Sequence, residues 1–199
     1  MTAKKTIAVF DFDETLVYKD SLIDFASHSV PGLIFFYKSL LFVPTFLRFK
    51  AKKIDNQTTK EAFLTLFFQG TTEDAFNTLC GRYADRLNAI TNTAALKKVR
   101  WHQQKGHKVI IVSASASSWI TPWAKQHNFN DVIATQLEFR HNKLTGKLVG
   151  KNCHGPEKAK RFLEAYPKRD GYELIVYGDG KSDREIFKLA DKYYEKRFN

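Results

Sequence analysis

Residues 6–16 read TIAVFDFDETL, an apolar run that ends in Asp11 and Asp13. A short apolar run between polar residues is typical of a strand that is buried on both faces of a sheet. Three later runs have the same character: HKVIIVSAS at residues 107–115, DVIAT at 131–135 and ELIVY at 173–177. Because helical patterns separate these runs, the sequence predicts an α/β fold with a parallel sheet and helices on both faces.

The remaining elements fit around these strands. Helices are predicted at residues 93–104, around Trp119 and Trp123, at residues 156–166, and after GDGKSD as far as Ala190. Residues 138–150, EFRHNKLTGKLVG, alternate in polarity on either side of a polar break. This alternation predicts a β-hairpin that follows the strand at 131–135.

A long helical block interrupts the alternation of strands and helices. Apolar residues recur at helical spacing through residues 20–88, and the block is too long to be one crossover helix. We therefore predict two parts in the chain. Residues 1–16 and 89–199 form a discontinuous core, and residues 17–88 form an inserted helical cap.

One segment of this block is strongly apolar: residues 30–49, VPGLIFFYKSLLFVPTFLRF. A spanning helix needs about 20 apolar residues, but Lys38 in the middle and Pro44 near the end favour one or two buried or interfacial helices. The basic run from Arg48 to Lys53 follows directly, so contact with a membrane surface through residues 31–49 remains an alternative. A spanning helix is the least supported interpretation.

The composition is basic, with 32 Lys and Arg against 21 Asp and Glu and a formal net charge of +11. Such a charge suits nucleic acid, anionic lipid or anionic substrates. The chain has neither zinc-finger spacing nor a basic-aromatic RNP-like strand, so we expect no nucleic-acid partner. The two cysteines, Cys80 and Cys153, lie far apart, and no secretory segment precedes the first strand. We expect a cytoplasmic location, with the inner face of the membrane as the alternative.

Residues suited to phosphate chemistry follow the predicted strands. They are Asp11 and Asp13 after the first strand, Ser113 after the second, Lys158 in the helix before the last strand, and Asp179 and Asp183 after that strand. Ligands bind at the carboxyl ends of strands in an open parallel sheet. Carboxylates that meet there repel one another, and a divalent cation with oxygen ligands, such as Mg²⁺, removes that cost. The set therefore predicts phosphoryl transfer.

Four stretches resemble the motifs of the haloacid dehalogenase-like (HAD) superfamily in their usual order: AVFDFDETL, VSAS, Lys158 in GPEKAK, and YGDGKSD. The helical block resembles the C1-type cap of that superfamily. The segments LTGKLVGKNCHG and GDGKSDREIFKLADKYYEKRF are similar to subfamily IB, the phosphoserine-phosphatase-like branch. The resemblance implies a Rossmann-like three-layer core and a phosphatase.

It also implies roles for single residues. Asp11 would attack phosphorus and form an aspartyl-phosphate, and Asp13 would act as general acid and then as general base. Thr15 would help to hold Asp13. Ser113 and Lys158 would bind the transferring phosphoryl group.

The implied cofactor is Mg²⁺. Asp11, the backbone carbonyl of Asp13, and Asp179 would hold the ion, and Asp183 would support the site. The supporting positions in these motifs also include Ala114 and Gly180.

The substrate remains open between a small phosphorylated metabolite and a phospholipid head group, and the alternative to an enzyme is a non-catalytic phospho-acceptor or binding protein. Asp20 is either a helix cap or a contact for substrate specificity. Relatives that act on phosphoserine usually carry Glu at this position, and Gly-Gly where this chain has Ala114-Ser115. The six histidines show no ligand spacing and are interpreted as structural.

Overall fold

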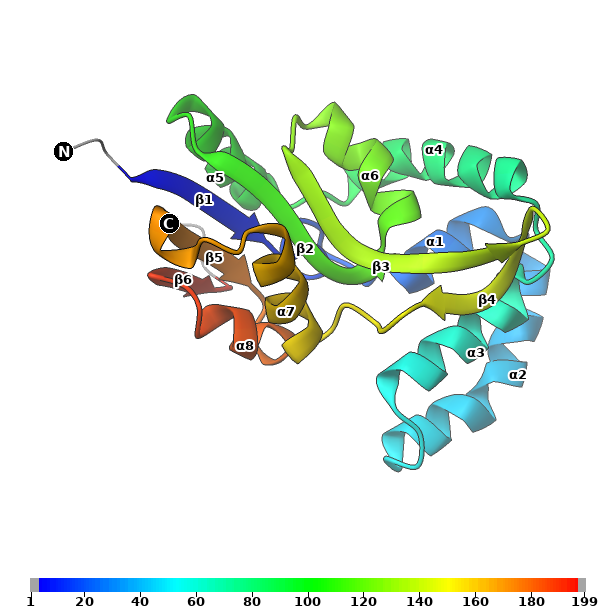
Figure 1. The fold of residues 1–199 in the computed structure, drawn as a ribbon. Helices are drawn as coiled ribbons and strands as arrows, with labels where there is room; N and C mark the ends of the chain where they lie inside the picture. Colours follow the sequence, from blue (N-terminus) through cyan, green and yellow to red (C-terminus); the bar gives the residue numbers. More distant parts are fainter. Residues whose placement is uncertain (1–3, 197–199) are drawn as a thin grey trace.

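The computed structural model describes residues 4–196, and six strands form one sheet in the order β4-β3-β2-β1-β5-β6 (Figure 1). The strands are β1 (Lys5–Phe10), β2 (Lys108–Ala116), β3 (Asp131–Arg140), β4 (Lys143–Val149), β5 (Tyr172–Gly178) and β6 (Lys192–Glu195). All neighbouring strands pair in parallel except β3 and β4, which are antiparallel. The predicted α/β fold with a mostly parallel sheet is confirmed.

The helices either flank the sheet or stand beside it. They are α1 (Ser21–Ser29), α2 (Gly32–Lys50), α3 (Asn56–Phe68), α4 (Glu73–Ala89), α5 (Thr93–Gln104), α6 (Ser117–Gln126), α7 (Pro156–Ala165) and α8 (Arg184–Phe187). Helices α5 and α6 cover one face of the sheet, and α7 and α8 cover the other (Figure 1). The result is a three-layer core.

Strand β1 lies inside the sheet and is buried on both sides. Ile7 and Val9 belong to the apolar cluster that contains Phe162 of α7, whereas Ala8 and Phe10 belong to the cluster that contains Val99 of α5. Successive side chains of a strand point to opposite faces. The uninterrupted apolar run before Asp11 is therefore required by two cores, one on each face.

The hairpin differs from its prediction, because β3 is one strand of ten residues and does not separate into a strand and a hairpin arm. Its first half pairs in parallel with β2, and its second half pairs antiparallel with β4. At the turn, His141 and Asn142 have φ values of 48° and 58°. Two positive φ values suit the twist of a tight hairpin. Strand partners depend on tertiary contacts, so sequence alternation did not show that the two segments are continuous.

The end of the chain also differs from the prediction of one helix as far as Ala190. Helix α8 ends at Phe187, and β6 adds an edge strand beside β5. The carboxylate of Asp191 accepts hydrogen bonds from the backbone N–H of Leu174, at 2.7 Å, and from Arg169, at 2.7 Å. These bonds turn the chain into the sheet where a helix would otherwise continue.

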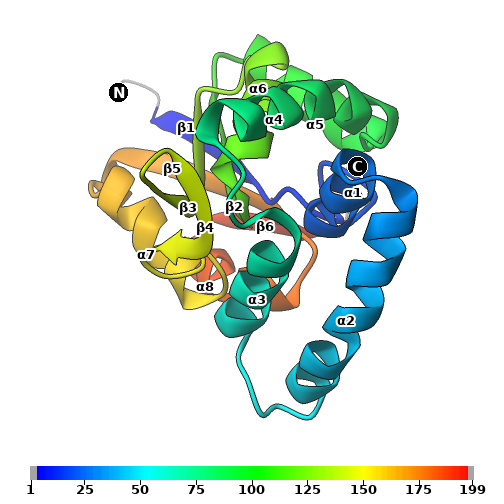
Figure 2. The same cartoon turned by 90° about the vertical axis from the view of Figure 1, so that its right-hand side faces the viewer.

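The segment between β1 and α5 holds α1 to α4. Helix α1 is tied to α4 because Asp24 accepts hydrogen bonds from Tyr83, at 3.2 Å, and from Arg86, at 3.1 Å. Helices α2 and α3 form a lobe that projects from the rest of the molecule (Figure 2). The division of the chain into a core of residues 1–16 and 89–199 and a cap of residues 17–88 remains a prediction, and residues 1–3 and 197–199 of that core lie outside the described range.

The apolar segment 30–49 was predicted to form one or two buried or interfacial helices. It forms one helix, α2, and the buried alternative is wrong. None of the residues of α2 is buried. One side of the helix packs on α3, with the rings of Phe35 and Phe67 5.6 Å apart and those of Phe42 and Phe63 5.2 Å apart. The other side has no partner among residues 4–196, because a single neighbouring helix covers only one stripe of α2. In length and composition α2 could also cross a membrane.

The hairpin and the lobe meet at a glycine. Gly146 in β4 has a φ of +83°, and a Cβ atom there would lie 2.7 Å from the backbone nitrogen of Thr65 in α3. The backbone N–H of Gly70 also donates to the carbonyl of Leu144, at 2.9 Å. Close approach of these two backbones joins α3 to the sheet.

We predict that Gly146→Ala lowers the free energy of unfolding by about 1–3 kcal/mol through backbone strain, with the overlap against Thr65 adding to the loss. Gly150→Ala is the matched control, because Gly150 has a φ of +73° but a Cβ atom there meets no atom within 4 Å. Urea unfolding measures both variants. Equal losses would show that the overlap of the added Cβ atom with Thr65 costs no stability.

Candidate active site

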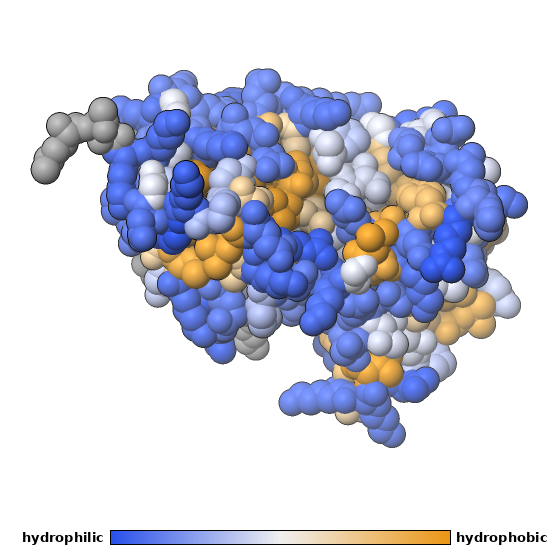
Figure 3. Space-filling model, viewed as in Figure 1, coloured by the Kyte–Doolittle hydropathy of each residue, from blue (hydrophilic) through white to orange (hydrophobic). Residues whose placement is uncertain are grey.

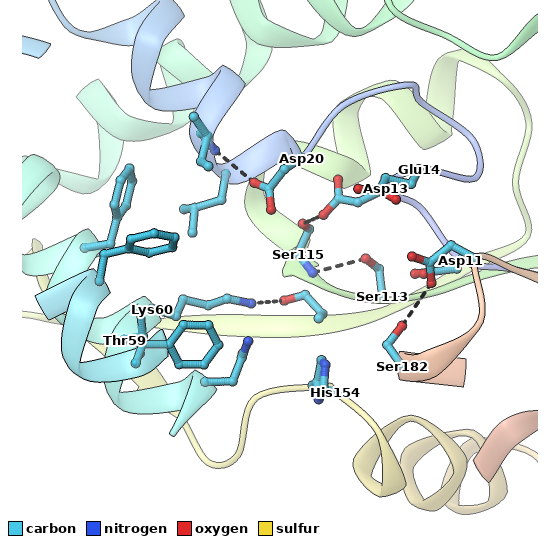
Figure 4. A pocket seen from close by; sticks show the side chains of 18 of the residues that line it. Asp11, Asp13, Glu14, Asp20, Thr59, Lys60, Ser113, Ser115, His154 and Ser182 are labelled. Carbon is cyan, nitrogen blue, oxygen red and sulfur yellow. Dashed lines mark hydrogen bonds between the residues drawn. The ribbon is translucent and has the colours of Figure 1, made fainter. Parts of the chain in front are cut away.

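A cavity of about 470 Å³ opens at the carboxyl edge of the sheet (Figure 4). Asp11 and Asp13 follow β1, Ser113 lies near the end of β2, and Asp179 follows β5. Lys158 reaches the cavity from the first turn of α7. The structure thus brings together residues that are up to 168 positions apart, as the strand-end argument predicted.

Lys158 is the centre of the charged part of the site. Its ammonium nitrogen lies 2.7 Å from Oδ1 of Asp11 and 2.6 Å from Oδ1 of Asp183, and the side chain is 1% exposed. Burial lowers the pKa of Lys158, but the two facing carboxylates outweigh burial and hold the pKa above its ordinary value. Burial raises the pKa of Asp11 above its ordinary value, and Lys158 opposes that rise. Because the pKa of Lys158 lies above its ordinary value, the lysine is charged at neutral pH.

Three carboxylates form a cluster that can hold a metal ion. One oxygen each from Asp11, Asp179 and Asp183 lies within 4.8 Å of the others. Burial and the neighbouring Asp183 raise the pKa of Asp179. A hard divalent cation with oxygen ligands would offset both the burial and the repulsion. The donor set therefore fits Mg²⁺.

Glycines allow the chain to close around this cluster. A Cβ atom on Gly178 would overlap the carboxylate of Asp183, which also accepts a hydrogen bond from the backbone N–H of Asp179, at 3.1 Å. Gly180 has a φ of +126°, which favours glycine. The turn after β5 can therefore place Asp179 and Asp183 at the same point.

A chain of hydrogen bonds holds Asp13. The indole N–H of Trp119 donates to Oγ of Ser21, at 3.1 Å, and Ser21 donates to Oγ of Ser115, at 2.8 Å. Ser115 donates to Oδ2 of Asp13, and the backbone N–H of Ser21 donates to Oδ1, at 2.9 Å. Both carboxylate oxygens are thus oriented by residues from α1 and β2.

The electrostatics of Asp13 suit proton transfer. Burial raises the pKa of Asp13 to about 6, the negative charge of Asp20 adds to the rise, and the bonds from Ser115 and Ser21 oppose it. A carboxyl group with a pKa near the operating pH can both give and accept a proton.

Thr15 differs from its expected role, and Asp20 fits both of the roles considered for it. Thr15, which was expected to hold Asp13, is buried, and its hydroxyl finds no hydrogen-bond partner within residues 4–196. Asp20 is the N-cap of α1, because its side chain accepts a hydrogen bond from the backbone N–H of Ile23, at 3.1 Å. Asp20 also lines the cavity (Figure 4), so the cap and the substrate contact are not exclusive interpretations.

The sequence argument missed Lys60, Ser21, Ser115 and His154. Lys60, on α3, donates from its ammonium to the carbonyl of Ala114, at 2.6 Å, and to Oδ1 of Asn152, at 2.9 Å. His154, which we interpreted as structural, lines the cavity and has a pKa lowered by burial. Ser115 lies in the VSAS stretch, but the stretch did not show that this side chain binds Asp13. No motif or spacing indicated a role for the other three, because packing between distant segments brings each of them to the site.

Lys60 places a cation opposite the carboxylates of the core. Burial lowers its pKa to about 8, and the negative charges of Asp13 and Asp20 oppose the fall. The ammonium is fixed by two neutral acceptors, so its charge remains available to the cavity.

The wall of the cavity opposite the carboxylates is aromatic. It is lined by Phe35, Phe42, Phe46 and Phe49 of α2 and by Phe63 of α3. The cavity therefore has a charged floor for an anion and an apolar wall for the rest of a ligand.

Fold and site together define an open-sheet α/β protein with a carboxylate-centred site at the carboxyl edge of its sheet, beneath helices inserted after the first strand. The chain belongs to the haloacid dehalogenase-like hydrolase family, whose model matches residues 8–188. The resemblance seen in the four motifs is thus confirmed over nearly the whole chain.

Two curated relatives align over most of this chain. Protein CicA of Caulobacter vibrioides is 27% identical over 188 residues, which are 94% of this chain and 83% of CicA. The phosphoserine phosphatase of Archaeoglobus fulgidus is 23% identical over 195 residues, which are 94% of this chain and 51% of that protein. The similarity thus extends beyond the motifs.

Solved structures share the fold at low identity. A protein of unknown function from Bordetella pertussis Tohama I has a TM-score of 0.83 at 20% identity, with 97% of this chain and 90% of that chain covered. A substrate-bound phosphoserine phosphatase has a TM-score of 0.67 at 20% identity, with 96% and 85% covered. A phosphoserine phosphatase with an analogue of the phospho-aspartyl intermediate has a TM-score of 0.66 at 20% identity, with 98% and 95% covered. The expected HAD fold is confirmed.

Lys60 gives a pH prediction. Its pKa is about 8 in the folded protein against an ordinary 10.5, so between these values the unfolded chain binds more protons. The free energy of unfolding therefore rises with pH across this window through Lys60. In Lys60→Met, we expect the free energy of unfolding to rise less between about pH 7 and about pH 10 than it does in the wild type. Urea unfolding at a series of pH values measures this rise.

The matched control is Lys53→Met, because Lys53 is an exposed lysine of the same lobe. The difference in unfolding free energy between wild type and Lys53→Met should stay constant with pH. A constant difference for Lys60→Met as well would contradict the lowered pKa of Lys60 in the folded protein.

Proposed function

We propose that this protein is a Mg²⁺-dependent phosphomonoester hydrolase that acts through an aspartyl-phosphate on Asp11. The observation that carries the proposal is the ion pair of 2.7 Å between Asp11 and the buried Lys158, beside the carboxylates of Asp179 and Asp183. A buried carboxylate held against a fixed cation can attack a phosphoryl group that the same cation attracts.

In the first step, a carboxylate oxygen of Asp11 forms a bond to phosphorus while the bond between phosphorus and the leaving oxygen breaks. Asp13 gives its proton to the leaving oxygen, which departs as an alcohol. Lys158 and the hydroxyl of Ser113 face the phosphoryl oxygens and stabilise their charge.

In the second step, Asp13, now a carboxylate, takes a proton from water, and the water oxygen forms a bond to phosphorus. The bond between phosphorus and Asp11 breaks, which releases inorganic phosphate and restores both aspartates. Ser115 and Ser21 keep Asp13 in one orientation through both steps.

The residues that would hold Mg²⁺ are Asp11, Asp179 and Asp183, with the backbone carbonyl of Asp13 as a further oxygen ligand. The ion would supply Lewis-acid stabilisation of phosphoryl charge and a fixed template for the substrate.

The relatives support a phosphomonoester as substrate, because two of the similar structures and one curated relative are phosphoserine phosphatases. The aromatic wall of the cavity favours a substrate with an apolar part over phosphoserine itself. The candidate class is a small phosphorylated metabolite or a phospholipid head group. A non-catalytic binding protein would have no need for the oriented Asp13.

We predict that Asp11→Asn lowers turnover of p-nitrophenyl phosphate by about 10³-fold or more, because the amide cannot act as the nucleophile. Turnover by the wild type should require Mg²⁺ and stop with EDTA. Asp55→Asn is the matched control, because Asp55 is an exposed N-cap of α3 and Asn also caps helices. Activity that survives Asp11→Asn would remove the aspartyl-phosphate mechanism, and no activity in the wild type would favour a non-catalytic protein.

A second prediction concerns Asp13→Asn. Loss of the general acid should slow alkyl phosphates by about 10²–10⁴-fold, and aryl phosphates less, since p-nitrophenolate leaves without a proton. Steady-state turnover of glycerol phosphate and p-nitrophenyl phosphate gives the two losses. Equal losses would argue against the acid role of Asp13.

A further inference from the structure

The outer side of α2 is an exposed apolar surface. Leu33, Phe36, Tyr37, Leu40, Val43 and Leu47 lie on it at helical spacing, and Leu33 is 87% exposed. Figure 3 shows hydrophobic side chains on the lobe of α2 and α3, and a hydrophilic tip where the two helices are joined. A contiguous exposed apolar surface of this kind marks an interaction site.

The charged residues of α2 itself are all basic. No Asp or Glu occurs between Asp24 and Asp55. Arg48 and Lys50 lie in the last turn of α2, and Lys52 and Lys53 come directly after the helix. An apolar helix face beside a basic cluster is complementary to an anionic membrane surface, where apolar side chains enter the acyl boundary and basic ones meet head groups.

The same helix connects this surface with the catalytic cavity. Phe35, Phe42, Phe46 and Phe49, on the inner side of α2, line the cavity that Asp11 and Lys158 also line. A ligand with its phosphate at Asp11 thus has its remaining atoms against the inner side of α2. The outer side of that helix is the exposed surface.

We propose that the outer side of α2 docks on an anionic lipid bilayer, and that the cavity receives a lipid phosphomonoester from it. The docking half rests on α2 alone, and the substrate half rests on the proposed phosphatase function. The location is then the inner face of the membrane, which was the alternative to a purely cytoplasmic one.

The helix lies on the bilayer and does not cross it. Its inner side is fixed to α3: Lys38 donates to the carbonyl of Phe67, at 3.2 Å, and Phe42 packs on Phe63. Helix α3 is in turn held to the core by the bond from Lys60 to Ala114. Insertion of α2 across a membrane would break these contacts and remove one wall of the cavity.

The docking half is tested by sedimentation with vesicles of phosphatidylcholine, with and without phosphatidylglycerol. The wild type should bind the anionic vesicles at least about tenfold more than the neutral ones, because both apolar and basic contacts contribute. Phe36→Asp with Leu40→Asp should lose this binding, and so should Lys50→Glu with Lys52→Glu. Neither pair lines the cavity, so turnover of p-nitrophenyl phosphate should remain that of the wild type.

Trp101→Asp is the matched control, since Trp101 is 45% exposed on α5, at the other end of the sheet from α2 (Figure 1). This variant should bind vesicles as the wild type does. Equal binding by all variants, or no binding by the wild type, would overturn the proposal. So would retention of bound protein after a wash with alkaline carbonate, which would indicate a spanning helix. Light scattering that shows a dimer broken by Phe36→Asp with Leu40→Asp would overturn it as well, in favour of a contact between two copies.

The substrate half uses phosphatidate in the same vesicles. Phe36→Asp with Leu40→Asp should lower phosphate release from phosphatidate by about tenfold or more while turnover of the soluble aryl ester is unchanged. Equal turnover of phosphatidate by both proteins would overturn the substrate half. Asp11→Asn should bind the vesicles as the wild type does, so failure of the phosphatase function and failure of docking give different results.

Discussion

The geometry of the site depends on the buried charge of Lys158. An ammonium that is 1% exposed is tolerated only where opposite charges compensate for lost hydration, and Lys158 has Asp11 and Asp183 within 2.7 Å. These three residues come from the end of β1, the start of α7 and the turn after β5. Their contact therefore requires that β1 and β5 lie side by side in parallel and that α7 packs with its first turn at their carboxyl ends. The same ion pairs thus place the proposed nucleophile Asp11 beside the proposed metal ligand Asp183.

The helices inserted after β1 complete the site from the opposite side. Ser21 of α1 holds Asp13 together with Ser115, and Lys60 of α3 reaches the carbonyl of Ala114 in β2. These bonds make the position of the inserted helices part of the geometry around Asp13, the proposed general acid. A shift of α1 or α3 would therefore change the surroundings of Asp13 without moving Asp11.

Helix α2 has two apolar sides with different surroundings. Its inner side borders the cavity, and its outer side faces solvent. Exposed apolar surface beside a basic cluster has a physical cost in water and a gain at an anionic bilayer. One helix thus links the apolar wall of the cavity with the surface proposed for docking, which is consistent with an amphiphilic phosphomonoester as substrate.

The sequence alone determined β1, β2, β5 and the first half of β3, because apolar runs without alternation are required in a sheet buried on both faces. It also determined the acidic residues that follow β1 and β5. Asp11, Asp13, Ser113, Lys158, Asp179 and Asp183 all meet where the strand-end argument predicted. The sequence did not reveal the continuity of β3, the edge strand β6, the exposure of α2, or the roles of Ser21, Ser115 and Lys60. The order of apolar and polar residues in a segment shows only whether that segment can form a buried or an exposed element. The features named above depend on which distant segments pack together. Only the tertiary structure decided them. For Ser21, Ser115 and Lys60 it did so through hydrogen bonds that join residues more than 50 positions apart.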